Sequence, residues 1–267
     1  MPAGVKLSAY VLTHDSERLL SRVLAPLRCV ADEILVVDSG STDRTVDIAL
    51  EHGCRVLIQP FENFPRQRQF AQTSCSHDHV LFVDSDEIMS EALVNAVLQA
   101  KQDGFPEQRY TFRREWLIMG RPVRAIYPIK SPDYPIRILD RRTDHFLASR
   151  GVHETPSNHL EHGRIDQPLL HVTYETADEF EKKLQLYSQL ASDDVIASGV
   201  SLPSRANVVV RAGLAFFKWY IVRGSWRDGR VGLRCGAFAA RYTYRKYELA
   251  RRVSRRARPQ QYTAMGI

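Results

Sequence analysis

Residues 79–87 read His-Val-Leu-Phe-Val-Asp-Ser-Asp-Glu, an apolar run that stops on two aspartates. The apolar part, 80–83, is typical of a strand buried on both faces of a parallel sheet. Such sheets bind their ligands just beyond the carboxyl ends of the strands. Because side chains two apart on a strand point the same way, Asp84 and Asp86 can converge on one point. Two carboxylates repel each other there unless a cation lies between them, so both are predicted ligands of a divalent metal ion.

Outward from this strand, the first hundred residues alternate between strand-like and helix-like segments. Buried apolar runs predict strands at 5–12, 33–37, 55–58 and 80–83. Apolar residues at helical spacing predict helices at 16–28, 42–52, 64–73 and 90–102. This alternation indicates an α/β fold with a mostly parallel sheet that is flanked by helices.

Beyond residue 110 the pattern changes. Thr176 and Glu179 form a capping box at the start of a helix that Gly199 ends. Two more helices are predicted, at about 205–223 and 230–256. Short β-like pieces suggest an irregular antiparallel extension with functional loops, at 110–113, 135–139 and 169–172.

Composition places the chain among ordinary globular proteins, with 267 residues, 44% apolar and 25% charged. We expect one α/β domain over residues 1–200 and a basic, amphipathic helical extension over 201–267. The four cysteines are scattered without a Cys-x-x-Cys pair, which argues against a zinc site or a disulfide framework and fits a reducing cytoplasm. Neither a secretory signal nor an 18-residue apolar stretch is recognisable, so no spanning helix is expected.

The net charge of +6 is unevenly distributed. Residues 205–258 hold 15 Lys or Arg against Asp228 and Glu248, which leaves 22 basic and 29 acidic residues in the remainder. Within the basic part, Phe, Trp and Tyr side chains at 216–226 alternate with arginines. This mixture suits the headgroup region of an anionic membrane. A helical lid or a merely solvated basic face are the alternatives, and nucleic acid is disfavoured because no binding signature accompanies the charge.

Polar side chains also follow the first two predicted strands. The first strand runs into Thr13, and the second into Asp38, Ser39 and Gly40. Both strand ends would lie on the same rim as Asp84. Asp38 could accept hydrogen bonds from a base or a ribose, and the small residues after it can lie close against a ligand. The alternative is that residues 38–43 form only a structural turn that caps the next helix.

Longer motifs surround these residues: 36–45 read Val-Val-Asp-Ser-Gly-Ser-Thr-Asp-Arg-Thr, and 81–87 read Leu-Phe-Val-Asp-Ser-Asp-Glu. Together they resemble the family-2 glycosyltransferases, and more narrowly the branch with bacterial lipopolysaccharide-core glucosyltransferases. The resemblance covers most of residues 5–190 and extends to segments at 65–71, 137–139, 151–154 and 171–174. It implies a GT-A fold, a nucleotide-sugar donor, a divalent cation and inversion at the anomeric carbon.

The resemblance also implies roles for individual residues. Asp38 would hold the uracil or ribose, Asp84 the ribose or a bound water, and Asp86 the metal. Arg68 could pair with a phosphate or a carboxylate. The family's opening Thr-x-Asn-Glu stands here as Thr-His-Asp-Ser at 13–16, with Glu17 one place late. The expected nucleotide-sugar residues are Thr13, Glu17, Asp38, Ser39, Gly40, Asp43, Arg68, Asp84 and Ser85.

An inverting transfer needs a general base that takes the proton of the acceptor hydroxyl. By the resemblance, Glu154 in the segment Val152-His153-Glu154 occupies the place of that residue. His153 competes, because an imidazole already titrates near neutral pH. His171 is expected to be a packed strand residue rather than a ligand.

Taken together, these features predict an enzyme that uses Mg²⁺ or Mn²⁺ and a UDP-sugar, with glucose the expected sugar. The expected acceptor is a lipid-linked or lipopolysaccharide-type glycan of the cell envelope. The expected location is cytoplasmic, peripheral on the inner face of the membrane. The rival functions are a nucleotidyltransferase, which would usually carry a Gly-rich loop after the first strand, and a non-catalytic protein that binds nucleotide, membrane or RNA.

Overall fold

The computed structural model describes residues 4–144 and 162–264, with side chains in the last helix described as far as residue 254. Its chain divides into two compact units. Unit 1 comprises Met1–Glu115 and Asp133–Val172, and unit 2 comprises Trp116–Pro132 and Thr173–Ile267. The units are therefore interleaved along the sequence, unlike the expected division near residue 200.

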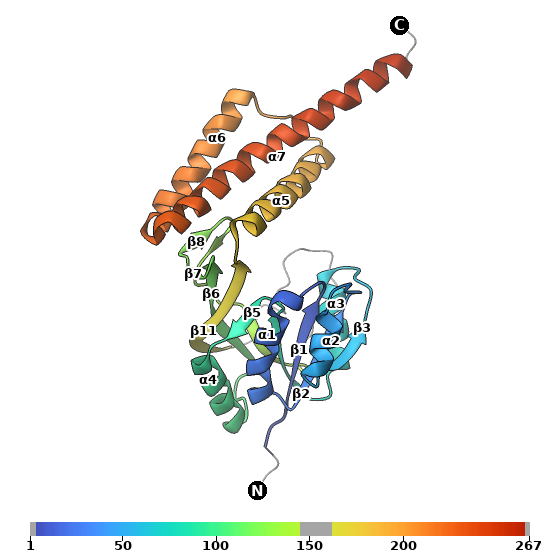
Figure 1. Ribbon diagram of the computed structural model, residues 1–267, viewed down its shortest axis with the longest axis vertical. Helices are drawn as coiled ribbons and strands as arrows, with labels where there is room; N and C mark the ends of the chain where they lie inside the picture. The colour runs from blue at the N-terminus through green and yellow to red at the C-terminus, as the bar shows by residue number, and fades with distance from the viewer. Residues whose placement is uncertain (1–3, 145–161, 265–267) are drawn as a thin grey trace. The chain divides into compact units, whose positions relative to one another are not determined.

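Unit 1 is built on a mixed sheet (Figure 1). Its parallel half has the order β3-β2-β1-β4, with bounds β1 Leu7–Thr13, β2 Glu33–Asp38, β3 Arg55–Ile58 and β4 His79–Asp84. The sheet continues through β10, β6, β11 and β5, which have bounds Ile136–Asp140, Arg109–Ile118, Gly163–Tyr174 and Glu87–Met89. Strand β10 runs antiparallel to β4 and joins the two halves. The predicted α/β fold with an antiparallel extension is thereby confirmed.

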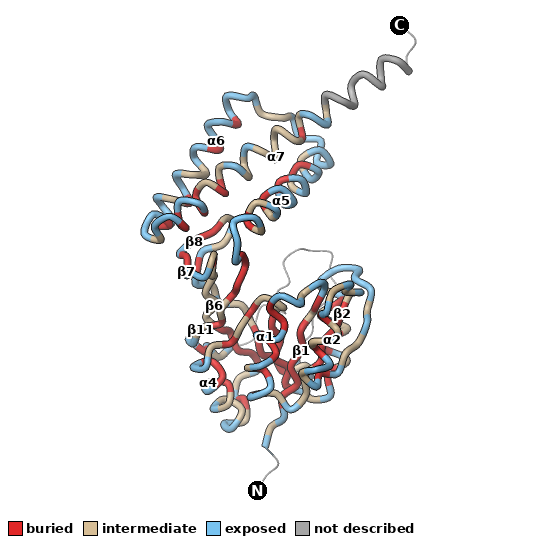
Figure 2. Tube along the Cα trace, in the orientation of Figure 1, coloured by how far each residue is buried: buried red, intermediate tan, exposed pale blue. Residues whose placement is uncertain are grey.

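Helices cover this sheet, with bounds α1 Glu17–Val30, α2 Thr45–Glu51, α3 Phe64–Ser74 and α4 Glu91–Gln102. Alternate residues of the parallel strands point to opposite faces, so Tyr10, Val37 and Phe82 pack with Ala71 of α3 and with Cys75, which follows the helix. Strands β1 and β4 are buried almost throughout, as their apolar runs predict. Figure 2 shows the burial of β1.

Helix α2 begins at Thr45, not at the predicted residue 42. The reason is local, because residues 38–43 form a hydrogen-bonded turn before the helix. The Asp43 carboxylate accepts hydrogen bonds from the backbone N–H of Thr45 at 2.9 Å and from its hydroxyl at 2.5 Å. Asp43 therefore fixes the start of the helix.

Unit 2 combines short strands with three helices. The strands are β7 Arg121–Pro122, β8 Ala125–Ile126 and β9 Ile129–Lys130. The helices are α5 Ala177–Ala197, α6 Arg205–Phe217 and α7 Gly229–Ala264, and between α6 and α7 lie a π turn, Lys218–Val222, and a 3₁₀ turn, Ser225–Asp228. Thr176 caps α5 by accepting from the backbone N–H of Glu179 at 3.2 Å, as the capping box predicts.

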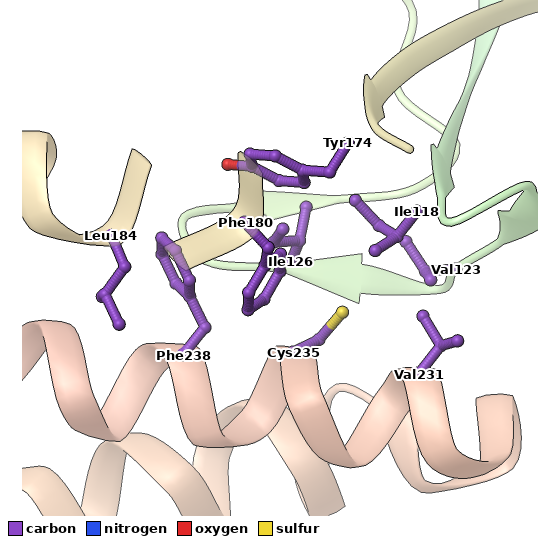
Figure 3. Packing of buried hydrophobic residues seen from close by; sticks show 9 residues of the cluster. All are labelled: Ile118, Val123, Ile126, Tyr174, Phe180, Leu184, Val231, Cys235 and Phe238. Carbon is purple, nitrogen blue, oxygen red and sulfur yellow. The ribbon is translucent and has the colours of Figure 1, made fainter. Parts of the chain in front are cut away.

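An apolar core joins these elements (Figure 3). It consists of Ile118, Val123, Ile126, Tyr174, Phe180, Leu184, Val231, Cys235 and Phe238. Glycine lets α7 approach the turns closely, since a Cβ on Gly232 would lie 1.7 Å from the carbonyl oxygen of Ser225. No helix among residues 4–144 and 162–264 is long and apolar enough to cross a bilayer.

Glu33, at the start of β2, ties three parts of unit 1 together. Its carboxylate accepts hydrogen bonds from the Ser8 hydroxyl at 2.5 Å, the Ser76 backbone N–H at 2.7 Å and Arg55 Nη2 at 2.9 Å. Burial raises the pKa of Glu33, but these hydrogen bonds outweigh it and lower the pKa from 4.5 to about 2. The ionised form is therefore the one that stabilises the fold.

A depressed pKa in the folded state contributes stability above the unfolded pKa, and that stability is lost as the pH falls through the folded value. Glu33→Gln should therefore lower the free energy of unfolding near neutral pH by about 2 kcal/mol, allowing for solvent screening. It should also make the loss of stability between about pH 4.5 and 2 shallower.

Urea unfolding followed by circular dichroism measures this effect, because all three tryptophans lie in unit 2 and would not report on unit 1. Glu51→Gln is the control, since Glu51 is 63% exposed and should contribute less than about 1 kcal/mol. Parallel acid profiles for Glu33→Gln and the unmodified protein would contradict the assignment.

Candidate functional site

The ends of three parallel strands meet at one edge of the sheet in unit 1. Strand register pairs Thr13 with Asp38 and Leu12 with Asp84. The strand ends that carry the predicted site residues are thus neighbours, as the sequence pattern predicts.

Asp38 organises the turn after β2. Its Oδ1 accepts hydrogen bonds from the backbone N–H groups of Gly40 and Ser41, at 2.9 and 2.8 Å. Its Oδ2 accepts from the hydroxyls of Thr13 and Ser41, at 2.9 and 2.5 Å. Gly40 has a φ of +91°, a conformation that favours glycine. Asp38 is fully buried, so its observed role is to shape this loop, and direct contact with a nucleotide stays a prediction.

Glu17 and Asp43 hold the starts of two helices against each other. Asp43 Oδ2 accepts from the backbone N–H of Glu17 at 3.0 Å, and Glu17 Oε2 accepts from the backbone N–H of Arg44 at 3.1 Å. Asp15, with a φ of +45°, accepts from the backbone N–H of Thr42 at 2.8 Å. The loops after β1 and β2 are therefore held together by hydrogen bonds, and we call these two loops the platform. Ligand contacts by Glu17 and Asp43 stay predictions.

A cavity of about 400 Å³ opens beside this platform. Three of the predicted nucleotide residues line it, namely Thr13, Ser39 and Ser85, and the other lining residues are Leu12, His14, Phe61, Phe64 and Gln67. The sequence interpretation missed the last three of these. A pair of phenylalanines in a polar loop is the signal that could have found them.

The phenylalanines and the glutamine have distinct parts in the cavity. Phe61 and Phe64 lie edge to face with ring centroids 5.0 Å apart, and both are at least half exposed. The buried Gln67 donates from Nε2 to the Ser39 hydroxyl at 3.2 Å and to the Gln59 carbonyl at 3.0 Å. An exposed aromatic pair beside a fixed amide and hydroxyls suits a flat polar ring such as a nucleobase.

Asp84, at the end of β4, lies between two guanidinium groups. Its Oδ1 accepts from Arg68 Nη2 at 3.0 Å and its Oδ2 from Arg137 Nη2 at 3.2 Å. The same two arginines lie over the ring of Phe82, at 5.5 and 5.4 Å from its centroid. Arg68 thus contacts a carboxylate, which is one of the two partners expected for it.

Glu87 lies behind the acidic turn and is fully buried. It accepts from Arg137 Nη2 at 2.6 Å and Nε at 2.8 Å, from Arg114 Nη1 at 2.9 Å, and from the backbone N–H of Asp84 at 3.1 Å. Burial raises the pKa of Glu87, but Arg137, His171 and Arg114 together hold it well below its usual value. Sequence reasoning gave Glu87 no role, although it directly follows the two aspartates.

His171, on β11, lies against the same turn. Its Nδ1 is 3.6 Å from Asp86 Oδ1 and 3.5 Å from Glu87 Oε1, and its side chain is 11% exposed. Next to it, the backbone N–H of Val172 donates to the Asp86 carbonyl at 2.8 Å. His171 is a packed strand residue, as expected, but it is also adjacent to a predicted metal ligand.

The two predicted metal ligands have different surroundings. Both oxygens of Asp84 accept hydrogen bonds from guanidinium groups, and Asp86, in the turn after β4, lies 3.6 Å from His171 Nδ1. The two side chains are about equally exposed, at 31% for Asp84 and 29% for Asp86. Among the described residues, no three His, Cys, Asp or Glu side chains are grouped as a metal site. Asp84 and Asp86 both stay predicted ligands of a hard cation. A cation there would take further ligands from phosphates and water.

The predicted bases Glu154 and His153 lie within residues 145–161, outside the described residues. Their roles stay predictions.

Glu87→Gln should destabilise unit 1 by about 3 kcal/mol or more, because it removes the fully buried carboxylate charge that both Arg137 and Arg114 contact. Urea unfolding followed by circular dichroism at neutral pH checks this. Glu51→Gln again serves as the control. A loss for Glu87→Gln no larger than that of the control would show that the buried network contributes little.

Comparison with known proteins identifies the relatives of this chain. The family model described as glycosyl transferase family 2 matches residues 8–163. The lipopolysaccharide core biosynthesis glycosyltransferase LpsC of Rhizobium meliloti is 29% identical over 237 residues, covering 85% of this chain and 84% of LpsC. An uncharacterized glycosyltransferase of Rickettsia bellii is 25% identical over 249 residues, covering 88% of this chain and 83% of that protein.

Among solved structures, glucosyl-3-phosphoglycerate synthase from Mycobacterium tuberculosis, in complex with Mn²⁺, UDP and glucosyl-3-phosphoglycerate, matches 42% of this chain and 44% of its own. The identity is 24% and the TM-score 0.37, which carries no argument about function. The family model, by contrast, spans more than half of the sequence and includes the strand ends described above. The chain belongs to glycosyl transferase family 2.

Proposed function

We propose that the protein transfers a sugar from a UDP-sugar to a glycan acceptor with inversion at the anomeric carbon. One observation carries this proposal: Ser85 lines the cavity and stands between Asp84 and Asp86. A nucleoside whose base enters the cavity would thus have its diphosphate directed to the acidic turn. Membership of a glycosyltransferase family supplies the reaction class.

Within this proposal, the base would lie against Phe61 and Phe64, with polar contacts from Thr13 and Ser39. Asp86 would hold a divalent cation, Mg²⁺ or Mn²⁺, and His171 is close enough to orient Asp86. Such a cation supplies stabilisation of the charge that develops on the leaving diphosphate. The hydrogen bonds from Arg68 and Arg137 would hold the Asp84 carboxylate in place beside it.

Proton transfer from the acceptor hydroxyl would be the task of Glu154, the residue that the family resemblance assigns as the base. His153 remains the competing candidate. The acceptor we infer is a lipid-linked glycan of the lipopolysaccharide-core type, supported by the 29% identity to LpsC. Glucose is the proposed donor sugar, and the cytoplasmic face of the membrane is the proposed location.

Asp86→Asn should lower kcat for sugar transfer by about 100-fold or more, because it removes the charge that would hold the cation. The measurement is UDP release from UDP-glucose with a lipopolysaccharide-core acceptor and Mn²⁺. Asp47→Asn, an exposed site on α2, is the matched control. Unchanged transfer by a folded Asp86→Asn protein would contradict the metal assignment. The same result would reopen a non-catalytic binding role.

Phe64→Ala should weaken UDP binding by roughly 5- to 100-fold, because one aromatic contact with a base is worth about 1–3 kcal/mol. Isothermal titration calorimetry with UDP and Mn²⁺ measures the dissociation constant. Phe217→Ala is the control, since Phe217 is similarly exposed but belongs to unit 2. An unchanged dissociation constant for Phe64→Ala would place the base elsewhere.

A further inference from the structure

Helix α6 is apolar on two opposite sides. Its inward side is formed by Val208 and Ala212, which are buried against the rest of unit 2. Its outward side carries Val209, Leu214 and Phe217, which are 59%, 62% and 54% exposed. A surface helix normally places polar residues on its outer face, so this one leaves a second apolar face without a partner in the described chain. Figure 2 shows α6 exposed over most of its length.

The exposed apolar residues continue beyond the helix through both turns. Ile221 and Val222 in the π turn are 44% and 67% exposed, and Trp226 in the 3₁₀ turn is 48% exposed. We define the α6 face as the exposed apolar residues Val209, Val210, Leu214, Phe217, Ile221, Val222, Trp226 and Leu233. A series of this extent is typical of an interaction surface.

Not all of the aromatic set that the sequence singled out belongs to this face. Trp219 is buried and packs edge to face on Tyr127, with centroids 5.5 Å apart. Phe216 and Tyr220 are half-buried and contact each other at 5.0 Å. These three residues secure the turn, while Phe217, Ile221 and Trp226 are left to face outward.

The charges around the α6 face are positive. Exposed basic side chains are interspersed with its apolar residues, namely Arg211, Lys218, Arg223, Arg227 and Arg230. Arg227 also lies over the ring of Trp226, 4.8 Å from its centroid.

The acidic residues of this region are withdrawn from the surface. Between residues 205 and 254 they are Asp228 and Glu248. The Asp228 side chain is 5% exposed and accepts from the backbone N–H and Nη1 of Arg124, both at 2.7 Å. The Glu248 side chain is 16% exposed and lies 2.6 Å from Arg251. Over the described side chains of residues 205–254, the exposed formal charge is therefore entirely basic.

The positive charge of the α6 face favours an anionic partner over a second copy of this chain. A second copy docking through the same face would bring like charges together, which is unfavourable. Helix α5 offers a contrast within unit 2, because its exposed Leu186 and Leu190 accompany the acidic residues Asp178, Glu179, Glu181, Asp193 and Asp194. Aromatic and aliphatic side chains mixed with arginine match the headgroup boundary of an anionic leaflet.

We infer that the α6 face binds the surface of an anionic phospholipid bilayer, with its apolar residues entering the headgroup region and its arginines contacting lipid phosphates. This inference shares with the proposed function the expectations of a membrane-bound acceptor and of a location at the membrane. The two can fail separately, because none of the residues of the α6 face belongs to the cavity or the acidic turn.

Co-sedimentation of the full chain with vesicles tests the inference. Vesicles of phosphatidylcholine mixed with phosphatidylglycerol should bind the protein, and vesicles of phosphatidylcholine alone should bind it at least about tenfold more weakly. Added salt should weaken binding to the mixed vesicles. Absence of binding to the mixed vesicles, or binding that is indifferent to lipid charge, would overturn the inference.

Matched double variants locate the surface. Leu214→Glu with Phe217→Glu should reduce vesicle binding at least about tenfold. Leu186→Glu with Leu190→Glu, at similarly exposed positions on α5, should leave it unchanged. Equal losses for the two pairs would overturn the assignment to α6. A dimer that the α6 pair dissociates in sedimentation equilibrium, or RNA binding without vesicle binding, would also overturn it.

A third pair tests the same surface in case the Leu214→Glu, Phe217→Glu protein does not fold. Arg223→Ala with Arg227→Ala changes exposed side chains only and should weaken binding by about 30-fold, at about 1 kcal/mol for each basic residue near an anionic surface. Unchanged binding by this pair would overturn the electrostatic part. Sugar transfer to a soluble acceptor should be unaffected in all three pairs, which separates failure of docking from failure of the proposed function.

Discussion

The candidate site at the carboxyl ends of β1, β2 and β4 depends on the buried charge cluster around Glu87. One carboxylate without solvent exposure contacts two guanidinium groups and the backbone of Asp84. Arg137 extends the cluster to the Asp84 side chain, so the turn that holds Asp86 is fixed from behind. Removing charges from water is costly, and such a cluster is maintained only when its geometry satisfies every partner. The strand β10 that supplies Arg137 is consequently as much a part of the site as β4.

Carboxylates also accept hydrogen bonds within the protein in the loops after β1 and β2. The Asp15 carboxylate accepts from a backbone N–H of the neighbouring loop, and those of Asp38 and Asp43 accept from backbone N–H groups of their own turn. Asp38 and Asp43, which the sequence predicts as ligand contacts, thus also stabilise the shape of these loops. These hydrogen bonds fix the backbone of the platform, and the fixed backbone positions the hydroxyl and amide groups that line the cavity beside it.

Much of the fold was predictable because its parallel strands are short apolar runs that end in polar turns. Strand β4 was predicted at residues 80–83 and spans His79–Asp84. Long-range pairing was not predictable, since local pattern does not encode which distant strand joins an edge. Insertion of β10 beside β4, and hence the Arg137–Glu87 contact, depends on that pairing. The hydrogen bonds that Asp84 accepts from arginines of two other elements depend on the same long-range arrangement, and its role as a cation ligand stays a prediction.

Interleaving of the two units has a consequence for biosynthesis. The edge of β4 has no antiparallel neighbour until residues 136–140 have left the ribosome, after the first segment of unit 2 has already been made. An unpaired strand edge is prone to join other chains. The nascent polypeptide therefore passes through an interval in which the parallel half of the sheet has an unpaired edge at β4, and in that interval chaperone protection would be most valuable.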